Sequence, residues 1–177
     1  AFDGDGDRVM MVDGDGSLIN GDQLIWLLAK HLNNKGELQG GVAGTLMTNM
    51  AVEVDLKKEK IEFERTKVGD RYVMQSLKQN NWKIGGESSG HVICLDYNST
   101  GDGIVAALQV LNALKETEQT LKSFSNLHPL FPQELINVRV DDADSILEKQ
   151  ELKTLVSDVE QQLGDSGRVL IPISGTV

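Results

Sequence analysis

Three aspartates near the amino end are separated by single glycines, in the run Asp3-Gly4-Asp5-Gly6-Asp7. Side chains at positions i, i+2 and i+4 converge only where the backbone curls, and glycine permits the torsion angles that a curl requires. Carboxylates brought together in this way repel one another unless a cation lies between them. Because the ligands are all oxygen, with no His or Cys beside them, the expected cation is Mg²⁺ or Ca²⁺ rather than zinc.

This run is also compared with an EF-hand loop and with a solvated acidic turn. An EF-hand loop needs Gly at its sixth position and Glu at its twelfth, and these positions hold Arg8 and Gly14, which excludes it. A solvated acidic turn neutralised by Arg8 stays an alternative. A guanidinium beside a metal site favours phosphoryl transfer, since two cationic centres would face the transferring group. The run Asp13–Gly16 has no basic neighbour and is predicted to be a hairpin turn.

A second polar segment, Gly85-Gly86-Glu87-Ser88-Ser89-Gly90-His91, combines a carboxylate, two hydroxyls and an imidazole between glycines. Carboxylates and hydroxyls suit sugar hydroxyls, which both donate and accept hydrogen bonds. His91 would be free for proton transfer near neutral pH. The alternative is a structural glycine-rich loop in which His91 is a satisfied core residue.

Composition narrows the classes of function. The 177 residues carry 27 Asp+Glu against 17 Lys+Arg, a formal net charge of −10, which argues against nucleic acid or an anionic membrane as partner. No window approaches the roughly 18 apolar residues of a membrane span, and no signal peptide is recognisable. A single cysteine, Cys94, lies in an apolar run and is predicted to be a buried small hydrophobe. A cytoplasmic protein is expected.

Strand and helix patterns alternate along the first two thirds of the chain and predict an α/β domain with a sheet covered by helices. The first helix is expected to follow Asp22 as its N-cap and to end near Gly36. Further helices are expected over residues 49–58, 70–80 and 102–115, and strands over residues 9–12, 40–45, 60–65, 82–85 and 92–95.

The segment Asn126–Pro132 holds two of the three prolines and is the expected linker. Beyond it, the patterns predict a strand over Glu134–Val140, a helix over Ser145–Leu163 and a strand over Arg168–Ile171. These are too few elements for a separate core, so they are expected to open a further domain. The polar run directly after Ala1 and the strand near the carboxyl end together suggest a piece of a longer protein.

Taken together, these motifs resemble the α-D-phosphohexomutase superfamily. Three segments carry the resemblance in the family's order: Asp3–Arg8 matches its metal loop, Gly86–His91 its sugar loop, and Ser174-Gly175-Thr176 the start of its phosphate loop. Three further stretches are similar to the phosphoglucosamine mutase branch: Gly44–Asn49, Thr66–Val73 and Asp96–Gly103. The resemblance covers nearly the whole chain. It implies a mixed sheet flanked by helices, followed by the truncated start of an α+β domain.

The resemblance also implies a reaction and a set of roles. Glucosamine 6-phosphate and glucosamine 1-phosphate would be interconverted through a phosphoserine and one Mg²⁺, for amino sugars of the bacterial envelope. The implied metal ligands are Asp3, Asp5 and Asp7, and the implied catalytic residues are Arg8, which stabilises charge, and His91, which assists proton transfer. The implied substrate-binding residues are Gly69, Asp70, Glu87, Ser89, Ser174, Gly175 and Thr176. Residues 1–20 would be the tail of domain 2, residues 21–126 domain 3, and residues 127–177 part of domain 4.

This sequence differs from the family's motifs at positions that affect the expected activity. The family's phosphoserine loop has no counterpart here, so the chain alone is expected to be inactive. Pro172 and Val177 stand where the phosphate loop usually has Arg and Glu. A phosphomannomutase or phosphoglucomutase is the nearest rival. A noncatalytic module that binds a divalent metal or carbohydrate is a rival of another class, and it would bind metal tightly.

Overall fold

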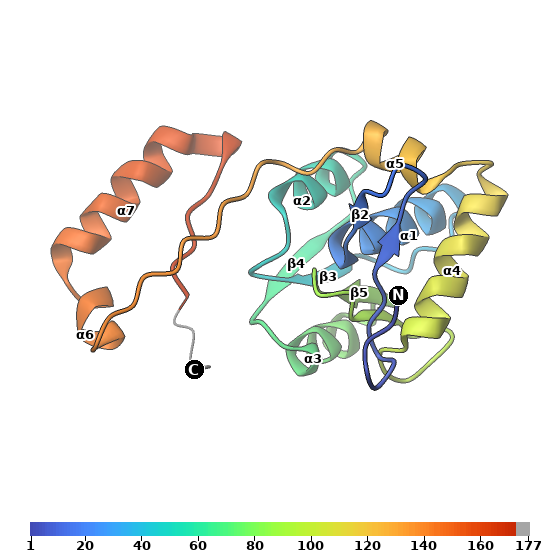
Figure 1. Cartoon of the computed structure of the whole chain (residues 1–177), viewed down its shortest axis with the longest axis horizontal. Helices are drawn as coiled ribbons and strands as arrows, with labels where there is room; N and C mark the ends of the chain where they lie inside the picture. The colour runs from blue at the N-terminus through green and yellow to red at the C-terminus, as the bar shows by residue number, and fades with distance from the viewer. Residues whose placement is uncertain (173–177) are drawn as a thin grey trace. The chain divides into compact units, whose positions relative to one another are not determined.

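The computed structural model describes residues 1–172 of the chain (Figure 1). The chain divides into two units, Ala1–Phe131 and Pro132–Val177. In the first unit the elements, in chain order, are β1 (Met11–Val12), β2 (Leu18–Ile19), α1 (Gly21–Lys35), β3 (Val42–Thr45), α2 (Met50–Lys58), β4 (Phe63–Thr66), α3 (Asp70–Asn80), β5 (Ile84–Gly86), β6 (Val92–Cys94), α4 (Gly103–Glu116) and α5 (Leu121–Leu127). In the second unit they are α6 (Ala143–Leu147), α7 (Gln150–Leu163) and a short 3₁₀ turn, η1 (Gly164–Ser166).

The main sheet has the strand order β4-β3-β5-β6. Strand β3 is parallel to both neighbours, with Val42 opposite Phe63 and Ile84, whereas β6 runs antiparallel to β5. A separate hairpin joins β1 to β2. The predicted α/β fold with a mixed sheet is therefore confirmed.

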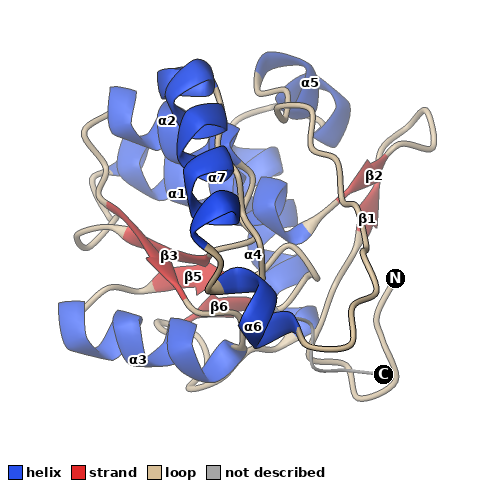
Figure 2. Ribbon diagram, turned by 90° about the vertical axis from the view of Figure 1, so that its left-hand side faces the viewer, coloured by secondary structure: helices blue, strands red, loops and turns tan. Residues whose placement is uncertain are grey.

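Helices cover both faces of this sheet. Helices α1, α2 and α4 lie on one face and α3 on the other, which gives three layers (Figure 2). Side chains alternate along each strand, so Val42 packs into the larger core with α1 while Ala43 packs with α3. Because both faces are covered, every residue of the central strands β3 and β5 is buried, whereas the edge strand β4 carries Glu64 and Arg65.

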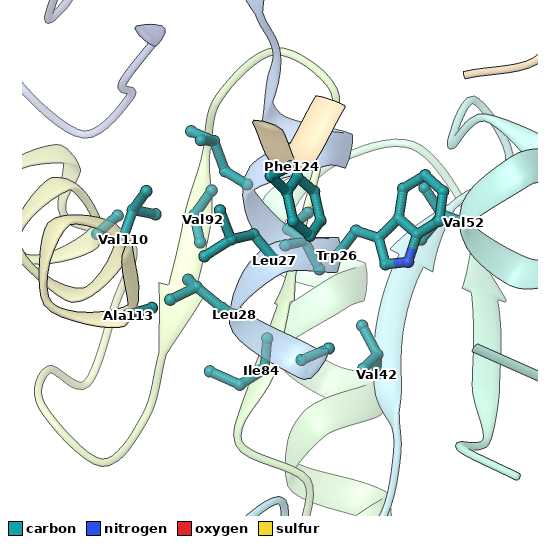
Figure 3. Packing of buried hydrophobic residues seen from close by; sticks show 14 of the residues in the cluster. Trp26, Leu27, Leu28, Val42, Val52, Ile84, Val92, Val110, Ala113 and Phe124 are labelled. Atoms are coloured by element: carbon teal, nitrogen blue, oxygen red, sulfur yellow. The ribbon is translucent and has the colours of Figure 1, made fainter. Parts of the chain in front are cut away.

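Helix α1 is the centre of the larger core. Its Leu24 and Ile25 are almost completely buried, and Trp26 packs edge-on against Phe124 with ring centroids 6.0 Å apart (Figure 3). The sequence patterns did not predict α5, the helix that contributes Phe124. Its signal is a capping box in which Thr120 and Ser123 each accept from the other's backbone N–H.

The expected N-cap of α1 was wrong. Asn20 is the cap, because its side chain accepts from the backbone N–H of Gln23. Asp22 lies inside the first turn, is 2 % exposed and accepts a hydrogen bond of 2.9 Å from the backbone N–H of Asn49. The Asp22 carboxylate therefore connects α1 to the start of α2 and does not cap the amino end of α1.

The second unit differs from its predicted elements. Residues 134–140 and 168–171 form no strand, and the side chains of residues 134–140 are exposed. An extended segment becomes a strand only when a partner accepts its backbone hydrogen bonds, and none pairs with these two within residues 1–172. The single predicted helix is divided into α6 and α7, since Lys149 takes an extended conformation with ψ 131°. Among the described residues, no helix is both long and apolar enough to cross a membrane.

Asn49 joins α2 to the end of the first unit. Its Oδ1 accepts from the backbone N–H groups of Ala51 and Phe131, both at 3.0 Å, and its Nδ2 donates to the Phe131 carbonyl at 2.9 Å. We expect Asn49→Ala to lower the free energy of unfolding by about 2 kcal/mol, because it removes a helix cap and two further hydrogen bonds. Urea denaturation followed by tryptophan fluorescence measures this change. Asn34→Ala, at an exposed position of α1, is the control, and an equal loss there would contradict the assignment.

Candidate functional site

One edge of the main sheet gathers the polar segments. Strands β3, β4 and β5 are parallel, so their carboxyl ends, at Thr45, Thr66 and Gly86, lie at the same edge. Strand β6 runs the other way and begins at that edge, directly after His91. Ligands of open α/β sheets bind in the crevice beyond the carboxyl ends of the strands. The edge is therefore where a bound molecule is expected.

Glu87 is held at this edge by the loop that follows β4. The backbone N–H of Gly69 donates to Oε1 of Glu87 at 2.8 Å, so the segments after β4 and β5 meet beyond the end of β3. Asp70 begins α3 with an exposed side chain, and Ser89 is exposed on the turn closed by the hydrogen bond from Gly90 N–H to the Glu87 carbonyl. Four predicted substrate-binding residues thus lie on two joined loops.

The three aspartates do converge. Carboxylate oxygens of Asp3, Asp5 and Asp7 lie within 4.8 Å of one another, with Asp3 and Asp5 exposed and Asp7 half-buried. Oxygens around an octahedral Mg²⁺ at about 2.1 Å are at most about 4.2 Å apart. A small closure of the loop would therefore satisfy Mg²⁺, and the all-oxygen set fits a hard cation.

Arg8 lies beside this cluster. Its Nε is 3.6 Å from Oδ2 of Asp3 and 4.0 Å from Oδ1 of Asp7, and its backbone N–H donates to Oδ1 of Asp3 at 3.2 Å. Partial loss of solvent opposes ionisation of Asp3, but that hydrogen bond, one from Asp7 and the Arg8 charge together lower its pKa. The pKa of Asp7 is raised. The largest cause is loss of solvent, and the hydrogen bond with Asp3 and the negative charges of Asp3 and Asp5 raise it further.

Close backbone contacts fix the aspartate loop to the rest of the first unit. The backbone N–H of Val9 donates to the Gly90 carbonyl at 3.0 Å, and that of Gly103 donates to the Gly6 carbonyl at 2.9 Å. Gly90 has a φ of 93°, and a Cβ there would overlap the carbonyl oxygen of Val9. A Cβ at Gly103 would lie 2.7 Å from the carbonyl oxygen of Arg8. The aspartate loop thus rests on two glycines. Neither is among the predicted site residues, although Gly90 lies within the predicted sugar loop, Gly86–His91.

His91 connects the two groups of predicted residues. It follows Gly90 in the loop that carries Glu87, and its Nε2 lies 3.5 Å from Oδ2 of Asp7. The residue is 4 % exposed. The structure therefore places the aspartate cluster and the Glu87 loop next to each other. Ser174, Gly175 and Thr176 lie outside the described residues.

Two predictions beside the site are confirmed. The run Asp13–Gly16 is the turn of the β1–β2 hairpin, where Oδ1 of Asp13 accepts from the backbone N–H groups of Asp15 and Ser17, both at 2.9 Å. Cys94 is buried in β6. Burial, and to a smaller extent the negative charge of Asp96, raises the pKa of its thiol to about 12. A thiol in this state is no nucleophile at neutral pH.

The fold defines an α/β/α domain whose predicted site residues gather beyond the carboxyl ends of its strands. Residues 20–130 match the family described as Phosphoglucomutase/phosphomannomutase, alpha/beta/alpha domain III, and the chain belongs to this family. It is 53% identical over 176 residues to the phosphoglucosamine mutase of Nitrosospira multiformis, a match that covers 99% of this chain and 38% of that protein. The chain thus spans about two fifths of the length of that relative.

Solved structures show the same fold. An N-acetylglucosamine-phosphate mutase of the α-D-phosphohexomutase superfamily, in its substrate complex, has a TM-score of 0.82 at 23% identity, covering 100% of this chain and 43% of that one. Aspergillus fumigatus N-acetylphosphoglucosamine mutase, in complex with GlcNAc-6P and magnesium, has a TM-score of 0.73 at 18% identity, covering 90% of this chain and 43% of that one. Magnesium and the sugar phosphate are features of that second protein.

The contact at Gly90 gives a stability prediction. We expect Gly90→Ala to lower the free energy of unfolding by about 3 kcal/mol, because a side chain is strained at this φ and overlaps Val9. Urea denaturation measures the change. Gly4→Ala is the matched control, since a Cβ there meets no atom within 4 Å. Similar losses in both variants would show that the close approach at Gly90 is unimportant.

The aspartate cluster gives a binding prediction. We expect Asp5→Asn to weaken Mg²⁺ binding at least about tenfold, because one of three charged ligands is lost. Mg²⁺ titration followed by NMR chemical shifts of the chain measures the dissociation constant. Asp13→Asn removes the same charge from the nearby hairpin turn, and its amide oxygen still accepts the turn's hydrogen bonds. If both variants weaken Mg²⁺ equally, the metal responds to net charge and not to a site.

Proposed function

We propose that this chain supplies the metal loop and the sugar loop of a phosphoglucosamine mutase, which interconverts glucosamine 6-phosphate and glucosamine 1-phosphate. The observation that carries the proposal is the contact between the two loops. Nε2 of His91 lies 3.5 Å from Oδ2 of Asp7, and the backbone N–H of Val9 donates to the Gly90 carbonyl. Identity of 53% to a phosphoglucosamine mutase supports this substrate over other hexose phosphates.

The aspartate cluster is the proposed metal site. Asp3, Asp5 and Asp7 would hold Mg²⁺, which supplies positive charge beside the phosphoryl group. Arg8 stands next to the cluster with its side chain half exposed, so its guanidinium can reach a phosphoryl oxygen while it stays close to Asp3. With Mg²⁺ bound, the cluster and Arg8 would offer two neighbouring cationic centres to a phosphoryl group.

The Glu87 loop is the proposed sugar site. Glu87 offers a carboxylate whose orientation the Gly69 N–H fixes, and Ser89 offers an exposed hydroxyl two residues further on. Asp70 adds a second carboxylate next to Gly69. Such groups accept hydrogen bonds from neighbouring sugar hydroxyls and hold the ring in one orientation, which accounts for much of the rate of phosphoryl transfer.

Other roles stay predictions. Ser174, Gly175 and Thr176 are proposed to begin the site for the unreactive phosphate, and residues 1–20, 21–126 and 127–177 are proposed to belong to three successive domains of the whole enzyme. A cytoplasmic location is proposed as well. The phosphoserine that the family resemblance implies has no counterpart in the motifs of this chain.

A phosphomannomutase or phosphoglucomutase is the second candidate. It is favoured by the description of the matched family, which names both activities. The two candidates share the metal loop and the phosphoryl transfer, and they differ in the sugar that the Glu87 loop accepts.

A chimera tests the activity. The 176 matched residues would replace their counterpart in the Nitrosospira multiformis enzyme, and kcat/KM would be measured on glucosamine 6-phosphate, glucose 6-phosphate and mannose 6-phosphate. We expect glucosamine 6-phosphate to be preferred, and Glu87→Gln to lower kcat/KM about 100-fold, as expected when a buried polar partner of the substrate is weakened. Asp158→Asn, exposed on α7, is the control. Preference for glucose or mannose phosphate would support the second candidate, and a folded chimera without mutase activity would contradict both.

A further inference from the structure

The position of His91 assigns it a role different from proton transfer. We infer that His91 is a positioning residue for Asp7: its ring holds one carboxylate oxygen so that the other faces the metal. The inference rests on the proposed function, because it takes Asp3, Asp5 and Asp7 as metal ligands. It concerns how Asp7 is oriented toward Mg²⁺, and it does not make His91 a metal ligand.

The ring of His91 is enclosed. The residue is 4 % exposed, and Nε2 points to Asp7, 3.5 Å from Oδ2. A group that exchanges a proton with a sugar hydroxyl must come within hydrogen-bond reach of it, directly or through one water. With Nε2 facing Asp7 and Nδ1 buried, neither ring nitrogen is open to such a hydroxyl.

The His91 ring occupies space that is open because residue 101 is a glycine. A Cβ at Gly101 would overlap the Nε2 and Cε1 side of the His91 ring, so a residue with a side chain there would displace the ring from its observed position. The backbone of His91 is fixed as well, since its carbonyl accepts from the Glu87 N–H at 3.0 Å. Enclosure by Gly101 and a fixed backbone leave the imidazole one orientation.

Asp7 needs such a support. Asp3 and Asp5 lie on the same short loop and repel it, and Arg8 offers a positive charge to Oδ1 from a distance of 4.0 Å. Oδ1 of Asp7 is buried and has no hydrogen-bond partner among residues 1–172. With Nε2 protonated, His91 can donate to Oδ2 and leave Oδ1 for the cation. Groups that orient metal ligands in this way typically change metal affinity 10–100-fold when they are removed.

Two substitutions of His91 test the inference. His91→Leu removes the donor, whereas His91→Gln places an amide N–H near the position of Nε2. We expect the Mg²⁺ dissociation constant of the chain, measured by NMR titration, to rise about tenfold in His91→Leu and to change less than about threefold in His91→Gln. Circular dichroism establishes that each variant is folded.

His31→Leu is the matched control. His31 is also buried, at 8 % exposure, and its Nε2 lies 3.2 Å from a carboxylate, that of Glu116. Glu116 is the last residue of α4, whereas Gly103, at the opposite end of α4, contacts the aspartate loop. We expect it to leave Mg²⁺ affinity unchanged although it removes a comparable contact. An equal loss of affinity in His31→Leu would show that general destabilisation is the cause and would overturn the inference.

The chimera separates positioning from proton transfer. A positioning role predicts that His91→Leu raises the Mg²⁺ concentration for half-maximal activity, while saturating Mg²⁺ restores most of kcat. Unchanged Mg²⁺ affinity with a kcat that stays low at saturating Mg²⁺ would assign proton transfer to His91 and overturn our inference. If the unaltered chain binds no Mg²⁺, the proposed metal site fails together with the inference, whereas normal binding in His91→Leu overturns the inference alone.

Discussion

Repulsion among three carboxylates is the constraint on which the rest of the site depends. Asp3, Asp5 and Asp7 bring oxygens within 4.8 Å of one another on a loop that is largely exposed. Arg8 offsets part of the repulsion, at 3.6 Å from Asp3, but like charges near the surface still separate when the backbone allows it. The arrangement persists because the backbone is hydrogen-bonded within the loop, from Gly103 to Gly6, and directly after it, from Val9 to Gly90.

Sheet topology explains why those anchors are near the residues predicted to bind the sugar. Parallel pairing of β3 with β4 and β5 brings the following loops to one edge, and the reversal at β6 returns the chain to that edge at His91. The same turn of chain therefore carries Glu87 on one side and binds the aspartate loop on the other. A phosphoryl group and the sugar that carries it need such neighbouring sites.

Sequence patterns predicted the fold well where apolar spacing was strong. The helix over Asp70–Asn80 was predicted with its observed bounds, and the alternation of strands and helices was confirmed. Asp22 was misassigned because a capping aspartate and a buried one look alike until the partner, here the N–H of Asn49, is known. The strands predicted after Phe131 require partners that local patterning does not reveal.

For the site, residue types were predictable and their contacts were not. The sequence identified the aspartates and the Glu87 loop, because few structural roles need three closely spaced carboxylates, or Glu, Ser and His grouped between glycines. The bond between Gly69 and Glu87, and the clearance that Gly101 leaves for His91, depend on close approaches between segments distant in sequence. Glycine has no side chain to mark such approaches, so only the coordinates disclose them.

Paramagnetic NMR with Mn²⁺ in place of Mg²⁺ tests the central claim most directly. If the aspartate cluster is a metal site joined to the sugar loop, low concentrations of Mn²⁺ will broaden the amide resonances of residues 3–8 first, then those of Gly90, His91 and Gly103, and excess Mg²⁺ will restore them. Broadening centred on Asp13–Asp15, or spread over the acidic surface of the chain in proportion to its charge, would contradict the account.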